Sequence, residues 1–441
     1  MRDILLIAIV FGSLPYAVMR PHVGLLMWSW LGYMNPHRFT WGIAYNFPFV
    51  QAAALATLVG FIFVRKERNQ FPVTAATIFW VLFVIWVSFT TIFANYPVDA
   101  QAEWQRTIKI QVMVFVTLML MASEYRINAL VWVIAGSIGF FGIKGGFFTV
   151  LTGGKYLVWG PPGSFIEGNN EIAFALLITV PLMAYLRSIS KDWWVRYGLV
   201  GAMVLSGFAI LGSYSRGALL GAAAMLFTLW LKSRHKFISA LGVVVVVSSL
   251  LAFMPSQWGE RMETIQTYEE DKSAMGRINA WWFAVNLAKD SPIVGGGFQT
   301  FRSDIFHKYA PNPEDFHDAH SIYFEVLAEH GFVGLFLFLG MGIATILTGS
   351  SIRRRAKGKK DVAWAYDLAG MLQVSFVGYA TGGAFLGLAY FDLPYHLMAV
   401  MALTKFVVEK RLVEAGAQTT PQDRPWRKHE AHHAGQQGRF T

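Results

Sequence analysis

The stretch HDAHSIYFEVLAEHGFVG, residues 317–334, sets titratable rings directly before an apolar run. His320 stands near the start of the helix that this run predicts, and a helix N-terminus favours the neutral imidazole. A neutral ring accepts a proton, so His320 is a candidate general base. The same residue can instead be a structural histidine held by hydrogen bonds, or form a metal site with His317 and Asp318, although the spacing is not a strong ligand pattern.

Two arginines have the chemistry that binds an anion. Arg216 is the only charged residue in 197–231 and lies at a tight turn before a predicted helix. A helix N-terminus and a guanidinium both favour a lipid phosphate there, and an interfacial anchor is the alternative. Arg277 falls in the first turn of a predicted amphipathic helix, where the dipole disfavours a cation. A bound anion explains that position, as does a solvated side chain or a pair with Glu269 or Asp271.

Further candidates are polar residues inside or beside apolar runs, namely Lys144, Asn170, Ser321 and His317. Lys144, in FFGIKGGFF, lies deeper than snorkelling easily explains, so it is a weak site candidate. Asn170 stands at a helix start, where asparagine is also a good N-cap. Two more cations, Arg106 and Lys109, begin another span, and we assign them no role.

These residues must be positioned by membrane helices, because the chain is too apolar for a soluble domain. It is 55% hydrophobic and 15% charged, with a mean hydropathy of +0.43, whereas soluble domains carry roughly 25% charged residues. Repeated apolar runs reach the ~20 residues that cross a bilayer as a helix. We therefore expect an all-α polytopic membrane protein. With no cysteine, disulfides and thiolate metal sites are excluded.

The apolar runs predict about 12 transmembrane helices. The clear spans are about 48–64, 72–93, 107–122, 128–150, 169–187, 196–214, 217–231, 236–254, 331–350, 365–388 and 392–408. Residues 4–34 hold two short apolar pieces parted by MRPH. They form either one broken span or a hairpin of short helices.

Basic loops set the expected orientation, because loops rich in Lys and Arg stay in the cytoplasm. By alternation they share one side: RKER (65–68), RSISKDWWVR (187–196), KSRHK (232–236) and RRRAKGKK (353–360). We assign the net charge of +10 to this topology, and we expect no nucleic acid as a partner. The candidate site residues fall on the opposite, outward side.

Four regions follow from this layout. They are an N-terminal transmembrane bundle (1–254), a periplasmic loop region with amphipathic helices (255–330), C-terminal transmembrane helices (331–410) and a disordered cytoplasmic tail (411–441). The tail is polar, and we expect its HEAHH run to be solvated rather than metal-binding.

The chain resembles the O-antigen ligase family, and especially its branch of exosortase-associated O-glycosylation ligases. The resemblance runs from MRDILLIAIVFGSLPYAVMRPHVGLLMWSWLGYMNPHRF to about residue 410. The family pattern H-[NSQ]-x9-G-x-x-[GTY] is matched by His320, Ser321, Gly331 and Gly334. The Ser-Arg-Gly turn is matched by Ser215, Arg216 and Gly217, and the Gly-Arg of the outer loop by Gly276 and Arg277.

The resemblance implies a metal-independent, inverting glycosyltransferase of the GT-C type that needs no cofactor. The donor would be a glycan on undecaprenyl diphosphate, and the acceptor a sugar hydroxyl of lipid A–core in lipopolysaccharide biosynthesis. His320 would be the base, while Arg216 and Arg277 would hold the diphosphate beneath the loop 255–330. The protein would be a monomer in the bacterial inner membrane, surrounded by membrane lipids, with its active site facing the periplasm.

Three other functions stay open at this point. An O-antigen polymerase and a protein O-oligosaccharyltransferase use the same kind of donor, and the acceptor is not legible in the sequence. A transporter with Lys144, Lys109 and Arg216 along its path is a third reading. The long outer loop and the set of one histidine and two arginines favour an enzyme.

Overall fold

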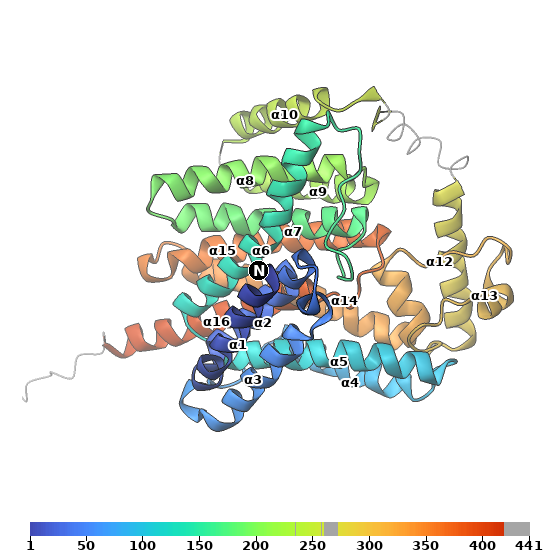
Figure 1. Cartoon of the computed structure of the whole chain (residues 1–441), viewed down its shortest axis with the longest axis horizontal. Coiled ribbons are helices and arrows are strands. Elements are labelled where there is room, and N and C mark those ends of the chain that lie inside the picture. The colour runs from blue at the N-terminus through green and yellow to red at the C-terminus, as the bar shows by residue number, and fades with distance from the viewer. Residues whose placement is uncertain (234, 257, 260–271, 419–441) are drawn as a thin grey trace, which may run out of the picture.

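The computed structural model describes residues 1–233, 235–256, 258–259 and 272–418, and every regular element in these ranges is a helix (Figure 1). The all-α prediction is confirmed. Five of the described helices are long and apolar enough to cross a membrane: α1 (Arg2–Met19), α6 (Glu124–Leu151), α7 (Asn169–Ile189), α8 (Trp193–Gly212) and α14 (Ile322–Ala356). Helices suit this setting because they satisfy every backbone polar group internally.

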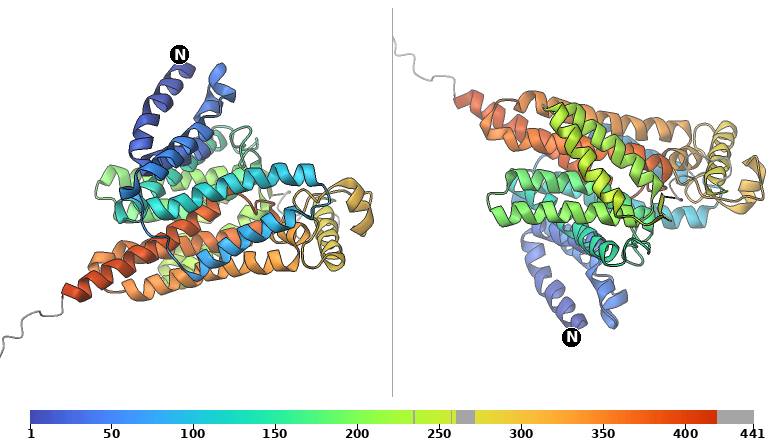
Figure 2. Two further views of the ribbon diagram at one scale, coloured as in Figure 1. Left: turned by 90° about the horizontal axis from the view of Figure 1, so that it is seen from below. Right: turned by 90° about the horizontal axis from the view of Figure 1, so that it is seen from above.

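The first apolar segment forms two helices rather than one broken span. α1 ends at Arg20, and α2 (Pro21–Met34) returns from there with Pro21 at its first position, where the missing N–H costs nothing. The two views of Figure 2 show these N-terminal helices (dark blue) projecting from one side of the bundle. The 3-10 helices η1 (Pro36–Phe39) and η2 (Ile43–Asn46) then lead into α3 (Phe49–Phe63).

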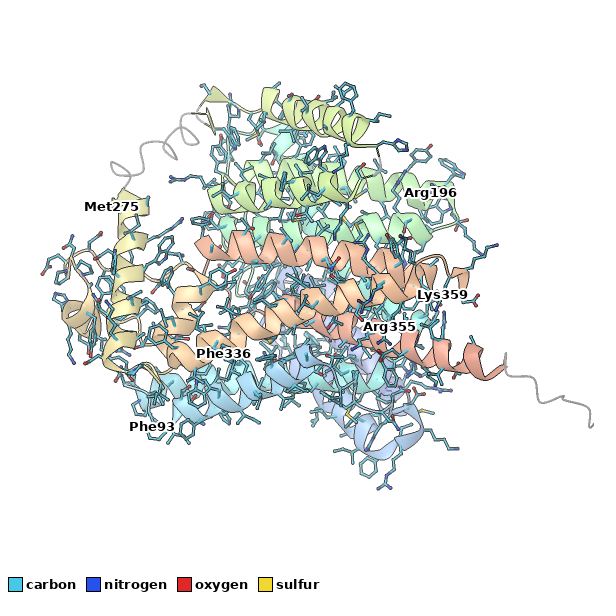
Figure 3. The ribbon with its side chains drawn as sticks, turned by 180° about the vertical axis from the view of Figure 1, so that it is seen from behind. Phe93, Arg196, Met275, Phe336, Arg355 and Lys359 are labelled. Carbon is cyan, nitrogen blue, oxygen red and sulfur yellow. The ribbon has the colours of Figure 1, made fainter. Side chains whose placement is uncertain are left out.

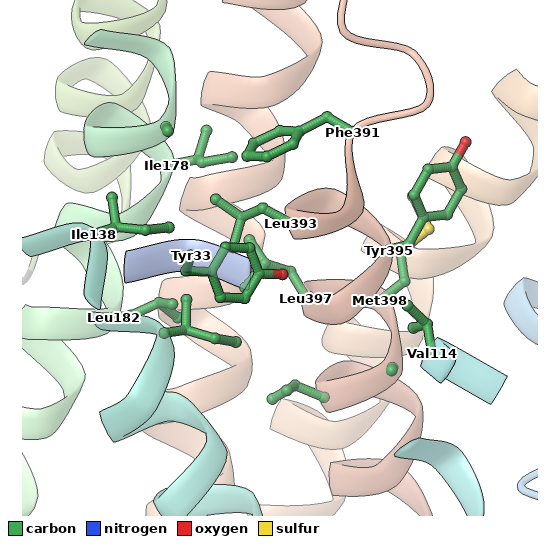
Figure 4. Close-up of a cluster of buried hydrophobic side chains, with 14 of the residues drawn as sticks. Tyr33, Val114, Ile138, Ile178, Leu182, Phe391, Leu393, Tyr395, Leu397 and Met398 are labelled. Atoms are coloured by element: carbon green, nitrogen blue, oxygen red, sulfur yellow. The ribbon is translucent and has the colours of Figure 1, made fainter. Parts of the chain in front are cut away.

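The remaining helices complete the bundle. They are α4 (Ala75–Thr91), α5 (Pro97–Leu120), α9 (Arg216–Lys232), α10 (Lys236–Ala252), α15 (Ala363–Gly382) and α16 (Asp392–Gln418), with the short 3-10 helices η3 (Arg65–Glu67), η4 (Lys360–Val362) and η5 (Gly383–Phe385). Figure 4 shows the centre of the core, where Leu393 and Leu397 of α16 face Ile178 and Leu182 of α7. All four side chains are fully or almost fully buried, so α16 is a core helix of the bundle.

Short helices cover one end of the bundle, and basic loop residues lie at the other. α12 (Lys272–Asp290) and α13 (Ser303–Tyr309) cover one end, with α12 lying across the bundle (Figure 1). In Figure 3, Met275 of α12 lies at this end, whereas Arg196, Arg355 and Lys359 lie at the other. Two of the loops that the sequence groups by their basic residues, 187–196 and 353–360, therefore share the end away from α12. Within 255–330, the helices α12 and α13 lie at the opposite end of the bundle, whereas the tail after 418 and the residues Glu269 and Asp271 lie outside the described residues.

α14 breaks at Gly331, and the break fastens a loop to it. Gly331 has φ 68° and ψ −171°, a conformation essentially confined to glycine. The carbonyls of Ala328 and Glu329, which the break frees, accept hydrogen bonds from the backbone N–H groups of Gly296 and Gly297, each at 2.8 Å. The first turns of α14, which follow His320, thus become a separate short helix docked under α12.

Glu67 gathers cations at the basic end. Its carboxylate accepts hydrogen bonds from Arg20 at 2.8 Å and from Arg126, and lies 3.0 Å from Nδ1 of His22. Burial opposes its ionisation, yet the two arginines hold the pKa of Glu67 below its ordinary value of 4.5. This one side chain therefore ties the turn between α1 and α2 to the start of α6.

We predict that Glu67→Gln lowers the free energy of unfolding by about 1 kcal/mol at neutral pH, because it removes the buried charge that pairs with the partly buried Arg126 and the more exposed Arg20. The folded-state pKa is depressed, so this stability is present above the unfolded pKa and is lost as pH falls through the folded pKa. Thermal unfolding in detergent at pH 7 and at acid pH measures it, with the exposed Glu414→Gln as control. Equal melting temperatures of wild type and Glu67→Gln at pH 7 would contradict the prediction.

Candidate active site

Arg216 is presented by the turn between α8 and α9. Ser215 caps α9, its hydroxyl accepting a hydrogen bond from the N–H of Ala218 at 3.3 Å. Tyr214 before it has φ 58°, and its hydroxyl donates to the carbonyl of Gly154 at 2.7 Å. The turn is therefore fixed on both sides, and Arg216 stands at the first position of α9, where the helix N-terminus also favours an anion.

Arg277 comes to the same place from α12. One cavity of about 30 Å³ is lined by both arginines together with Asn170, Phe174, Tyr214, Ser215, Gly217, Ala218, Gly382, Phe385 and Leu386. α12 is held there by its apolar face, since Phe283 and Leu287 are buried against Phe306 of α13 and Ala328 of α14. The structure thus brings together two guanidinium groups that are far apart in the chain.

His320 lies near Arg277 and has an unusual backbone conformation. Its φ of 40° falls in the left-handed region, which few non-glycine residues occupy. Trp281 of α12 holds it from both sides, because its indole N–H donates to the carbonyl of Ala319 at 2.8 Å and its ring stacks on Phe324 at 5.0 Å. Burial, and then the charge of Arg277, lower the pKa of His320 below its ordinary value of 6.5. Both effects favour the neutral ring, and burial is the larger of the two.

The neighbours of His320 differ in their surroundings. Ser321 begins α14 with its hydroxyl fully buried and without a hydrogen-bond partner among the described residues. His317 lies 3.0 Å from Asp315, and its ring occupies the space that a Cβ at Gly276 would fill, with Cδ2 only 2.2 Å from that position. A glycine before Arg277 is thus what lets α12 approach the histidine segment.

Of the other two candidate residues, one lines the arginine cavity and one lies away from it. Asn170 lines the arginine cavity, so α7 contributes to it. Lys144 does not line it: the side chain is exposed on α6, with its Nζ 5.4 Å from the centre of the Phe39 ring. Lys144 lies inside an apolar run because its side chain contacts Phe39 of η1, and it does not lie beside the two arginines.

Two acidic residues that the sequence analysis passed over hold this region together. Glu325 accepts a hydrogen bond from the N–H of Ala389 at 3.2 Å, and Glu329 accepts one from the hydroxyl of Tyr390 at 2.6 Å. The other oxygen of Glu329 accepts from the N–H of Gln299 at 2.8 Å. The sequence did contain a signal for them, because two carboxylates four residues apart in an apolar run are costly unless each forms hydrogen bonds.

The types of side chain at this site decide which ligands it can hold. The described part of the chain contains no group of three or more histidine, aspartate or glutamate side chains placed to hold a metal ion. His317, Asp318 and His320 therefore do not form such a group. What the site does offer is one neutral ring that can take a proton and two cations that can bind phosphoryl oxygens.

The segment that contains these residues is similar to a known protein family. Residues 192–339, which include Arg216, Arg277 and His320, match the family model described as O-antigen ligase. About a third of the chain is therefore similar to O-antigen ligases. Residues 1–191 match a family of unknown function, DUF5935, and no curated protein matches the chain. This similarity supports, in general terms, a membrane protein with a glycosyltransferase-like activity of the ligase or polymerase type, which in that family implies a lipid-linked glycan donor and a lipid acceptor.

We predict that Gly331→Ala disrupts this site. A Cβ at Gly331 would lie 2.4 Å from the carbonyl oxygen of Ile293 and would demand a backbone conformation that alanine avoids. Gly342→Ala, in the same helix with nothing within 4 Å of the added methyl, is the matched control. We expect a loss of about 2 kcal/mol for Gly331→Ala, and faster proteolysis between α12 and α14. Equal proteolysis of the two variants would refute the role of the break.

Proposed function

We propose that the protein transfers a glycan from undecaprenyl diphosphate to a sugar hydroxyl of lipid A–core, at the periplasmic face of the bacterial inner membrane. The observation that carries this proposal is the shared cavity of Arg216 and Arg277, with His320 close enough to feel the charge of Arg277 and all three inside the segment similar to O-antigen ligases. The orientation is supported by the basic loops, which lie at the end of the bundle away from the site.

In the proposed reaction His320 is the general base. Its neutral ring takes the proton of the acceptor hydroxyl as that oxygen attacks the anomeric carbon of the donor sugar. The carbon–oxygen bond to the diphosphate breaks, and the electron pair leaves with the diphosphate. Attack opposite the leaving group inverts the configuration of the anomeric carbon, so a base and a diphosphate site on two sides of the sugar suit this reaction.

Arg216 and Arg277 would stabilise the leaving diphosphate. Two guanidinium forks match phosphoryl oxygens better than ammonium groups do, and they act without a metal ion. Because the leaving group is already a weak base, it needs charge stabilisation and no protein acid. A cavity of about 30 Å³ holds little more than a water molecule, so the donor must widen it by moving these side chains or α12.

The alternatives differ in the product. A polymerase joins repeats on the carrier, a protein O-oligosaccharyltransferase modifies a Ser or Thr, and a transporter moves substrate without forming a bond. Deletion of the protein, followed by separation of core-linked from carrier-linked glycan, distinguishes them. Long chains retained on the carrier with none on lipid A–core support the ligase; single-repeat products point to the polymerase, and an unglycosylated protein to the oligosaccharyltransferase.

We predict that His320→Ala lowers glycan transfer by about 10² to 10⁴ fold, as expected for loss of a general base. The protein should still fold and still bind the carrier. Transfer is measured in liposomes with a chelator present, because the proposed reaction needs no divalent ion. His307→Ala, a histidine of α13 that is exposed at the same end, is the control. Normal transfer by His320→Ala would refute the assignment of the base.

We further predict a pH signature of the pair formed by Arg277 and His320. Transfer by the wild type falls as pH drops through the lowered pKa of His320, because the protonated ring accepts no proton. Arg277→Gln removes a positive neighbour, so the pKa of His320 rises and the acid limb of the pH–rate profile moves to higher pH.

We also predict that carrier binding by Arg277→Gln and Arg216→Gln weakens by about tenfold or more. Unchanged carrier affinity in both variants would end the diphosphate assignment, and an unmoved acid limb would separate Arg277 from His320.

A further inference from the structure

A second and much larger cavity lies between the N-terminal helices and α5. Its volume is about 870 Å³, and its walls come from α2, α3 and α5, with residues 163–166 and the start of α16 beside them. It shares no lining residue with the arginine cavity of the candidate active site. The proposed transfer reaction assigns this cavity no role.

One part of the cavity is strongly cationic. Three cations line it, namely Arg38 of η1 and Arg106 and Lys109 of α5, against one lining carboxylate, Asp392. The guanidinium of Arg106 lies over the ring of Phe165, 3.8 Å from its centre, which fixes its plane. Lys109 has no hydrogen-bond or ion-pair partner within the described ranges. The charges around the cavity therefore favour an anion.

Buried polar atoms beside these cations also lack partners. The His37 residue is only 8% exposed, it lines the cavity, and its Nδ1 has no hydrogen-bond partner among the described residues. The same holds for the buried Nε of Arg38. Nearly all buried polar groups in proteins are hydrogen-bonded, because a buried group without a partner loses its bonds to water and gains none in return. Of these two nitrogens the Nε–H of Arg38 is necessarily a donor, and the cationic guanidinium that it belongs to suits a ligand with acceptor oxygens.

The rest of the cavity is apolar. Ala54, Leu55 and Leu58 of α3 face Val112 and Met113 of α5 across it. Leu55 is exposed in an otherwise membrane-like helix, so this wall lies open toward lipid. A free phosphate would leave the apolar wall unused, and a peptide would bring polar backbone groups that this wall cannot satisfy. An amphiphile with an anionic head satisfies both parts.

We propose that this cavity binds a lipid with a phosphorylated headgroup. The phosphate oxygens lie between Arg38, Arg106 and Lys109, and the acyl chain runs along α3 and α5. The site is separate from the arginine cavity of α9 and α12, and the proposal does not depend on glycan transfer.

The test uses the full chain, purified in a non-ionic detergent and titrated with phosphatidylglycerol or phosphatidylcholine of the same acyl chains. Native mass spectrometry counts the lipids retained. We expect one phosphatidylglycerol to be retained about tenfold more tightly than phosphatidylcholine, because only the former carries a net negative charge. Millimolar inorganic phosphate should not displace it, since the chain contributes to binding.

Two kinds of variant locate the bound lipid. The combination of Arg38→Gln, Arg106→Gln and Lys109→Gln should weaken retention of phosphatidylglycerol by about tenfold or more, and Lys155→Gln, an exposed lysine outside the cavity lining, should not. Ala54→Trp fills the apolar part and should weaken retention without changing the charge. If the triple variant does not fold, Lys109→Gln alone serves, because this exposed side chain makes no contact whose loss could unfold the protein.

The proposal is overturned by any of three results. These are equal retention of the two lipids, equal retention of phosphatidylglycerol by the wild type and the charge and wall variants, and displacement by inorganic phosphate alone. The last result would leave a site for a bare anion and no lipid site.

Discussion

The break of α14 at Gly331 is the constraint on which the candidate site depends. An unbroken helix from Ile322 onward would keep the carbonyls of Ala328 and Glu329 in its own hydrogen-bond ladder. With the break, these carbonyls bind Gly296 and Gly297, and the short helix after His320 docks under α12. The spacing of nine residues between Ser321 and Gly331 thus has a physical meaning: it sets the length of that short helix.

The buried carboxylates of this short helix complete the arrangement. Glu325 bonds Ala389, and Glu329 bonds both Tyr390 and Gln299, so three separate segments converge on two side chains. Each bond satisfies a charge or a dipole that would otherwise be costly in a low-dielectric interior. These acids position the segment around His320.

Much of the fold could be predicted from apolar periodicity, because length and hydropathy alone select helices that span a membrane. The grouping of Arg216, Arg277 and His320 came from motif resemblance, and the structure places both arginines on one cavity with the histidine beside them. Local sequence could not show that Lys144 lies against Phe39, away from that cavity, since its position depends on how η1 folds back onto α6. Arg106 and Lys109 were visible as cations, but their cavity exists only through the packing of distant helices.

The segment between α15 and α16 relates the two cavities. Leu386 lines the arginine cavity, a Cβ at Gly387 would lie 3.6 Å from the Glu325 carboxylate and 3.9 Å from Cα of His320, and Phe391 lines the larger cavity. A few consecutive residues therefore stand between the candidate base and the proposed lipid site. Because Ala389 and Tyr390 in this segment are bonded to Glu325 and Glu329, a lipid that displaced Phe391 would act on the same helix that carries His320. The two cavities are therefore neighbours separated by one short segment, and the same two carboxylates of the helix before Gly331 hold that segment in place.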